Sequence, residues 1–178
     1  MKLPDGMQAA VFTDPSNLFY LTGYSNSDAA VVIIRDKAYY VTDKRCLGEA
    51  GRVMKGFETV DSDGESYVSK AVSLLSAKEA ETVGVEKDTI LYRNYLLFAE
   101  KFKKIADVSP YVKSLRAVKS TAEVEKIKAA QRITDETFAV VLGAVKENMT
   151  EKELASSIDT ELVRRGACPA FDTIAAFG

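Results

Sequence analysis

The side-chain types that most often perform enzymatic chemistry are unevenly represented in this chain, which has 178 residues and no histidine. A Ser-His-Asp triad, a Cys-His pair, a His-ligated zinc ion and an imidazole acid or base are therefore excluded from the chain itself. The densest acidic cluster is Asp61-Ser62-Asp63-Gly64-Glu65, and it lacks the ligand spacing of an EF-hand calcium loop. We interpret it as a turn followed by a helix N-terminus, where carboxylates are favoured.

The two cysteines, Cys46 and Cys168, are isolated from each other in the sequence. A nucleophilic cysteine needs a neighbouring base, and no histidine is present to serve as one. Isolated cysteines without a CxxC pattern are typical of a reducing compartment. The first residues also lack the apolar core of a signal peptide. We therefore expect a cytoplasmic protein.

A polar loop, Tyr24-Ser25-Asn26-Ser27-Asp28, follows Gly23 and precedes a long apolar run. Loops held by rigid elements frequently carry recognition, so this loop is a candidate binding segment. The aromatic residues near it are expected to pack in the core, because a base-stacking surface would need interleaved basic residues. These aromatic residues are Phe12, Phe19, Tyr20, Tyr24, Tyr39 and Tyr40.

The charge balance of 24 Lys and Arg against 26 Asp and Glu gives a net charge of −2. Proteins that bind nucleic acid usually concentrate cations strongly, so no nucleic-acid partner is expected. The cluster of Lys101, Lys103 and Lys104 is interpreted as a solvated helix face. No apolar run approaches the roughly 20 residues needed to cross a bilayer, and no membrane partner is expected.

Up to about residue 117, short β-like runs alternate with helical stretches. The pattern predicts strands at residues 8–13, 29–35, 38–42, 56–60, 81–86 and 106–108. It predicts one helix that begins at Asp14-Pro15. It predicts four further helices at residues 43–54, 64–77, 93–104 and 109–115. The strands at 29–35 and 38–42 flank the polar pair Asp36-Lys37 and should form a hairpin. Hairpins beside crossovers indicate a mixed sheet flanked by helices.

The remaining residues are mostly helical in pattern. Ser120 with Glu123 and Thr150 with Glu153 form two capping boxes, which predict helices from 120 to about 146 and from 150 to Gly166. The inner face of the first of these helices is expected to carry Val124, Ile127, Ala130, Phe138, Val141 and Val145. Residues 171–176 are predicted as a strand that ends the chain. Two helices and one strand make a poor closed core, so this part resembles the opening of a larger domain.

Four segments, in this order along the chain, match motifs of one known family. They are Asn17 to Tyr24 (NLFYLTGY), Tyr40 to Arg45 (YVTDKR), Leu115 to Ser120 with Glu123 (LRAVKS), and Met149 to Leu154 (MTEKEL) with Gly166 and Phe171 to Ile174 (FDTI). Together they resemble the creatinase/prolidase/aminopeptidase P family, the pita-bread metallopeptidases that act on Xaa-Pro bonds. Each motif alone is weak, but the four cover almost the whole chain.

The resemblance implies an α/β fold for residues 1–117, a creatinase-type N-terminal domain with a mixed β-sheet flanked by helices. For residues 118–178 it implies the incomplete start of a pita-bread α+β domain, with two helices and a strand. The parent protein is expected to bind two divalent metal ions (Mn, Co or Zn) that activate a bridging hydroxide. No metal ligand or catalytic residue of the family has a matching position here, so neither is assigned to this chain, and no cofactor is expected in it.

The resemblance also implies a function: the N-terminal part of a Xaa-Pro dipeptidase or aminopeptidase P, which hydrolyses the bond before proline in proline-containing peptides. The parent is expected to be a homodimer in which this part overhangs the partner's active site. Tyr24, Asn26 and Asp28 are accordingly predicted to lie at the substrate rim. The chain alone, interpreted as a truncated part of a longer protein, is expected to be inactive. The alternative is a non-catalytic, peptidase-like module that binds proteins.

Overall fold

The computed structural model describes residues 3–4 and 6–177 of the chain. They fall into two compact units, Met1–Val118 and Lys119–Gly178. No helix among the described residues is both long and apolar enough to cross a membrane.

The first unit is built on a six-stranded sheet with the strand order β4-β3-β2-β1-β5-β6. β1 pairs antiparallel with β2, and β2 with β3, while the other three neighbouring pairs are parallel. The predicted mixed sheet is therefore confirmed. The strands are β1 (Ala9–Phe12), β2 (Ala29–Ile34), β3 (Lys37–Thr42), β4 (Glu58–Asp61), β5 (Thr82–Val85) and β6 (Lys104–Asp107).

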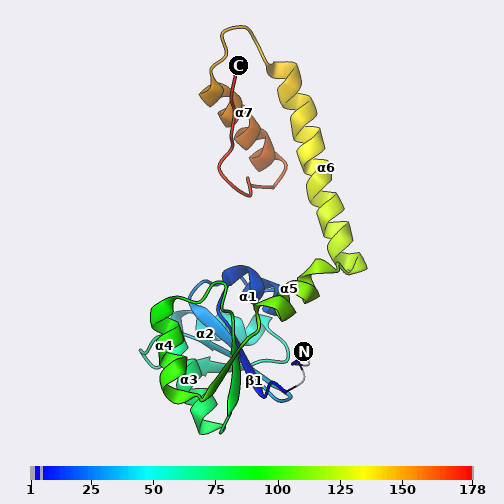
Figure 1. The fold of residues 1–178 in the computed structure, drawn as a ribbon. Helices are drawn as coiled ribbons and strands as arrows, with labels where there is room; N and C mark the ends of the chain where they lie inside the picture. Colours follow the sequence, from blue (N-terminus) through cyan, green and yellow to red (C-terminus); the bar gives the residue numbers. More distant parts are fainter. Residues whose placement is uncertain (1–2, 5, 178) are drawn as a thin grey trace. The chain divides into compact units, whose positions relative to one another are not determined.

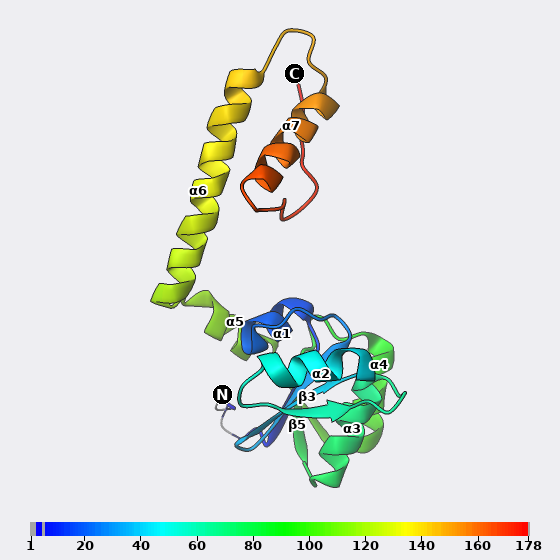
Figure 2. The same ribbon diagram turned by 180° about the vertical axis from the view of Figure 1, so that it is seen from behind.

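Five helices cover the two faces of this sheet (Figures 1 and 2). They are α1 (Pro15–Thr22), α2 (Lys44–Val53), α3 (Tyr67–Ala77), α4 (Tyr92–Lys101) and α5 (Ser109–Ala117). On one face, residues of α3 and α4 such as Leu75 and Phe98 pack in one apolar cluster. On the other face, Leu18 of α1, Ala50 of α2 and Val112 of α5 pack in a second cluster. All six residues of β2 are buried, as expected for a strand covered on both sides.

The second unit consists of α6 (Thr121–Ala144), α7 (Glu151–Arg164) and the segment that follows. Both capping boxes are present, with Ser120 and Thr150 each accepting a hydrogen bond from the backbone N–H of the glutamate three residues later. The two helices lie side by side (Figures 1 and 2), and Arg165 forms ion pairs with Glu136 of α6 and Glu161 of α7.

The β2–β3 hairpin differs from the prediction by one residue. Ile34 pairs with Lys37, so the turn is Arg35-Asp36 rather than Asp36-Lys37. Arg35 has φ 53, in the left-handed region that two-residue hairpin loops require. The sequence placed Arg35 in the strand because glycine and asparagine, the usual residues at such a position, are absent there.

The interpretation of the three lysines as one helix face was wrong. α4 ends at Lys101, Phe102 is extended (φ −118, ψ 131), and Lys104 begins β6 two residues earlier than predicted. β6 is an edge strand that pairs only with β5 among the described strands. Its apolar content is therefore low, and the sequence pattern did not reveal its first residues.

Two expectations for the second unit were also wrong. Residues 171–176 form no strand, because no strand partner lies beside them among the described residues. They follow α7 without regular structure, held by hydrogen bonds such as that from Thr173 Oγ1 to Asp159 (2.5 Å). The predicted inner face of α6 is largely exposed, with Phe138 at 66%, and only Thr137 and Val141 are buried in this helix.

Candidate functional site

The candidate site begins with the loop after α1, which is fixed at both ends by local signals. The Asp14 side chain caps α1 by accepting a hydrogen bond from Asn17 N (3.0 Å), and Pro15 occupies the first turn. Gly23 ends the helix in the left-handed conformation (φ 70), and its N–H donates to Phe19 O (2.7 Å). The helix therefore places Tyr24 and the following residues at a defined position before the start of β2.

Tyr24, the first predicted rim residue, is half-buried and points toward α2. Its hydroxyl donates a hydrogen bond to Glu49 Oε2 (2.8 Å), and its ring packs edge-on against Tyr40, with centroids 6.1 Å apart. The hydrogen bond with the Glu49 carboxylate raises the pKa of Tyr24 to about 12. The phenol is therefore a neutral donor at physiological pH, and its role in this structure is to attach the loop to α2.

Asn26 and Asp28 form the remainder of the predicted rim. Asn26 Nδ2 donates to Thr42 Oγ1 (3.2 Å), and Asn26 Oδ1 accepts from Asp28 N (2.9 Å), which closes an Asx turn. The Thr42 hydroxyl in turn donates to Asp28 O (3.1 Å). Only the Asp28 side chain is exposed, so it is the one rim residue with a carboxylate available to a ligand.

Tyr40 lies beneath this loop and has an unusual environment. It is fully buried, and its hydroxyl has no hydrogen-bond partner among the described residues. Burial raises the pKa of Tyr40 to about 12, and the nearby Asn26 amide opposes this effect in part. An unpaired buried hydroxyl lowers the stability of the folded state, so the Tyr40 hydroxyl destabilises the packing below the loop.

A buried carboxylate, Glu86, joins the start of α1 to the end of β5. It is 2% exposed and accepts hydrogen bonds from Thr13 N (2.6 Å), Asp14 N (2.9 Å) and Asn17 Nδ2 (2.6 Å). Burial raises the pKa of Glu86 above its ordinary value, and the three hydrogen bonds that it accepts oppose this only in part. The negative charge lies at the positive N-terminal end of α1, where it is favoured.

The same network reaches α5. The Asn17 amide donates to Glu86 and accepts from Arg116 Nη1 (2.6 Å), so it bridges the carboxylate and the guanidinium. Beside it, the Tyr20 hydroxyl donates to Leu115 O (3.0 Å). Asn17 and Arg116 belong to two of the family motifs found in the sequence. These motifs are therefore in direct contact, although the two residues are 99 positions apart in the chain. Their contact attaches α5, the last helix of the first unit, to α1.

The sequence predicted that Tyr24, Asn26 and Asp28 lie in one loop. It did not identify Glu86, Glu49 and Thr42 as the residues that bind this region through hydrogen bonds. Glu86 could have been found from one signal, a charged residue directly after the apolar run of β5. Because β1 and β5 are parallel neighbours, their carboxyl ends meet at one edge of the sheet. This pairing places Glu86 next to Thr13 and Asp14.

The described residues contain no group of three or more His, Cys, Asp or Glu side chains that could hold a metal ion. Cys46 and Cys168 are both free thiols rather than a disulfide. In the acidic cluster, Asp63 forms an ion pair with Lys70, and Ser66 caps α3. This agrees with a turn and helix start there, with the cap two residues later than Gly64.

Comparison with known proteins gives two consecutive family matches. Residues 4–118 match the Creatinase/Prolidase N-terminal domain, and residues 125–178 match Metallopeptidase family M24. An uncharacterised peptidase of Bacillus subtilis is 27% identical over 176 residues, covering 97% of this chain and 50% of that protein. A Xaa-Pro dipeptidase of Pyrococcus furiosus is 37% identical over 107 residues, covering 57% of this chain and 30% of that protein.

Solved structures give the same picture of the fold. The prolidase from Pyrococcus furiosus superposes with a TM-score of 0.83 at 25% identity, covering 96% of this chain and 49% of that chain. The Xaa-Pro dipeptidase from Bacillus anthracis superposes with a TM-score of 0.83 at 22% identity, covering 90% and 45%. The predicted α/β fold is therefore confirmed. The chain spans about half the length of most relatives that it matches.

Proposed function

The chain belongs to the Creatinase/Prolidase N-terminal domain family, and from this premise we propose that it is the N-terminal part of a Xaa-Pro metallopeptidase. In this proposal, residues 1–117 are the N-terminal domain and residues 118–178 are the start of the catalytic domain. The whole protein hydrolyses the peptide bond before proline in proline-containing peptides. The observation that carries the proposal is the match of two family profiles, N-terminal domain and metallopeptidase, in the same order along one chain.

Catalysis in the whole protein requires a metal centre, which we propose to contain two divalent ions (Mn, Co or Zn). Such a centre supplies a hydroxide nucleophile and polarises the scissile carbonyl. The described residues do not fit it, since they gather no three metal-ligating side chains and the sequence has no histidine. The ligands are therefore assigned to a part of the whole protein outside this chain, and the 178-residue chain alone is proposed to be inactive.

Within the whole protein, the loop from Tyr24 to Asp28 is proposed to control substrate access. The contacts of Tyr24 with Glu49 and of Asn26 with Thr42 hold the loop in one conformation. The exposed Asp28 carboxylate can then accept hydrogen bonds from the ammonium group of a peptide N-terminus. In this arrangement Tyr24 and Asn26 position the loop, and Asp28 binds the substrate.

We further propose a cytoplasmic homodimer in which the first unit takes part in the subunit contact. The two unpaired cysteines are consistent with a reducing compartment. Light scattering of the complete protein measures its mass directly, and cell fractionation gives its location. A monomer at working concentration, or recovery from a membrane or secreted fraction, would contradict these two points.

The test of the function compares the purified chain with the complete product of its gene. Both are incubated with a Gly-Pro dipeptide and with a longer Xaa-Pro peptide in the presence of Mn²⁺, Co²⁺ or Zn²⁺. The complete product is expected to release proline or the Xaa residue, and the preferred peptide length separates a dipeptidase from an aminopeptidase. Metal-dependent cleavage by the chain alone would contradict its inactivity. A complete product that cleaves neither peptide would favour the alternative, a non-catalytic protein-binding module.

A further inference from the structure

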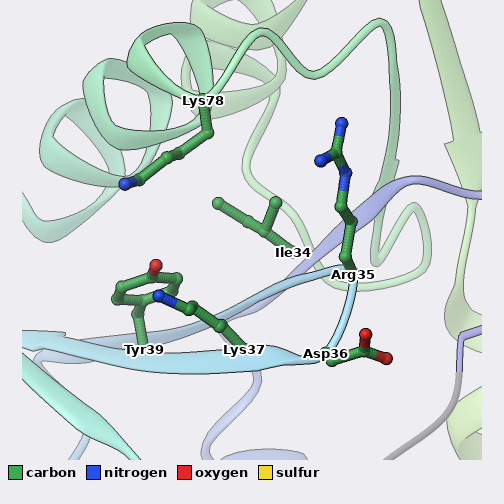
Figure 3. A pocket seen from close by; sticks show the side chains of 6 residues that line it. All are labelled: Ile34, Arg35, Asp36, Lys37, Tyr39 and Lys78. Atoms are coloured by element: carbon green, nitrogen blue, oxygen red, sulfur yellow. The ribbon is translucent and has the colours of Figure 1, made fainter.

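A cavity of about 290 Å³ lies where the β2–β3 hairpin meets the C-terminal end of α3. Figure 3 shows the six side chains that line it, which are Ile34, Arg35, Asp36, Lys37, Tyr39 and Lys78. Tyr39 packs in the apolar cluster on the α3 side of the sheet, whereas Tyr40 packs on the opposite side, below the rim loop. The cavity is therefore a separate place from the candidate site described above.

The charges around this cavity are unbalanced. Arg35, Lys37 and Lys78 contribute three positive charges and Asp36 one negative charge, which leaves two positive charges. Figure 3 shows the Asp36 carboxylate turned away from Lys37 and Lys78. Within the described part of the chain, none of the three cations forms an ion pair, in contrast to Lys70 on the same helix α3, which pairs with Asp63.

The hydroxyl of a buried tyrosine also points into the cavity. Tyr39 is 3% exposed, and Figure 3 shows its hydroxyl directed to the space between Ile34 and Lys78. No hydrogen bond joins this hydroxyl to another residue of the described part of the chain, and unlike the Tyr40 hydroxyl it opens into the cavity rather than lying sealed in the core. The hydroxyl is therefore a donor within reach of an acceptor that enters the cationic cavity.

Helix-end electrostatics accounts for only one of the three cations. Lys78 caps the C-terminal end of α3, where a positive charge interacts favourably with the helix dipole. Lys37 and Arg35 lie in the hairpin, so the dipole of α3 does not explain their position beside the cavity. Arg35 also occupies a left-handed backbone conformation (φ 53) that glycine or asparagine adopts more easily. Arg35 thus occupies this position at a conformational cost, and its side chain has no ion-pair partner in the described structure.

From these observations we propose that the cavity binds a phosphate-type dianion through Lys37, Lys78, Arg35 and the Tyr39 hydroxyl. A doubly charged oxyanion balances the two uncompensated positive charges, and it offers several acceptors to Lys37, Lys78 and the Tyr39 hydroxyl on one side of Ile34, with the Arg35 charge on the other side (Figure 3). A phosphate or pyrophosphate ion, or the phosphoryl group of a small phosphoester, fits the available volume. This binding is independent of the peptidase function proposed above.

The experiment is a calorimetric titration of the full 178-residue chain at low salt with inorganic phosphate, with pyrophosphate and with a nucleoside monophosphate. Saturable one-site binding is expected, and it should weaken as salt is added. Binding of the monophosphate assigns the site to phosphoesters, whereas binding of the inorganic ions alone assigns it to free phosphate or pyrophosphate. Absence of saturable binding by all three probes overturns the proposal.

Four variants locate the binding. Lys37→Gln and Lys78→Gln are each expected to weaken it at least about tenfold, and Tyr39→Phe several-fold, as lost charge-assisted hydrogen bonds do. The matched control is Lys55→Gln, since Lys55 is an exposed lysine away from the cavity. Arg35→Asn should weaken binding while raising the midpoint of thermal unfolding, because it relieves the backbone conformation. Equal affinities in Lys78→Gln, Lys37→Gln and the control would overturn the proposal.

Discussion

Asn17→Ala is expected to destabilise the first unit more than any other single-amide truncation in it. Asn17 is 7% exposed and links two charged groups, Glu86 and Arg116, through hydrogen bonds of 2.6 Å each. Alanine removes both the donor to the carboxylate and the acceptor from the guanidinium. Glu86 then keeps two backbone donors, and Arg116 loses its bond to α1, which leaves the bond from Tyr20 to Leu115 O between α1 and α5.

The magnitude follows from the kind of bonds lost. Each hydrogen bond to a charged group contributes about 1.5–3 kcal/mol, and a water molecule entering the vacated space recovers part of the sum. A net loss of about 3 kcal/mol in the free energy of unfolding is therefore expected. This corresponds to a fall of roughly 10 °C in the unfolding midpoint of a unit of this size.

The assay is amide hydrogen exchange of the central strands β1 and β2, which reports the first unit separately from the second. Exchange of the most protected amides should accelerate on the order of 100-fold in the variant. Asn94→Ala is the matched control, since it makes the same change in α4 at a side chain without such a network. Combining Asn17→Ala with Arg116→Ala should cost less than the sum of the single changes. If Asn17→Ala behaves like the control, or if the two changes add fully, the network does not hold α5 as described.

Three further predictions concern single positions in the first unit. Tyr40→Phe removes a buried hydroxyl without a partner among the described residues. Thermal unfolding should therefore show unchanged stability or a gain of up to about 1 kcal/mol. A loss of stability would mean that the hydroxyl is paired. Gly84→Ala would place a Cβ 3.2 Å from Val108 Cβ and 2.5 Å from Met7 Sδ, and urea unfolding should show a loss of about 1–2 kcal/mol, whereas Gly48→Ala, in open space, should show none. Burial raises the folded-state pKa of Glu86 above its ordinary 4.5, so the protonated side chain stabilises the fold at low pH, and this contribution is lost as pH rises through the folded pKa. The free energy of unfolding of Glu86→Gln, measured from acid to neutral pH, should lack this decline. An identical pH profile in both proteins would refute the raised pKa of Glu86.

Local signals in the sequence were enough for most of the first unit. The apolar run Ala29–Ile34 predicted a strand buried on both faces, and Asp14-Pro15 with Gly23 predicted both ends of α1. The capping boxes at Ser120 and Thr150 predicted the starts of α6 and α7. In each case the information lies within a few residues, so tertiary contacts were not needed to find it.

The remaining features depend on partners far away in the chain. Glu86 is buried only because β5 lies parallel to β1, a pairing that no local pattern encodes. The Glu49 partner of Tyr24 depends on how α2 packs below the loop. The apolar pattern of α6 was read correctly as one face of a helix, but burial needs a covering surface, and Ile174 in the segment after α7 is itself 84% exposed. For the same reason residues 171–176 have strand composition without a strand to pair with.

The most direct test of the peptidase assignment is the rate at which the complete gene product cleaves an Xaa-Pro peptide and its Xaa-Ala counterpart, before and after chelation of divalent metal. We expect cleavage of the proline peptide only, loss of activity on chelation, and recovery when Mn²⁺, Co²⁺ or Zn²⁺ is returned. Equal cleavage of both peptides, activity that survives removal of the metal, or no cleavage at all would contradict the account.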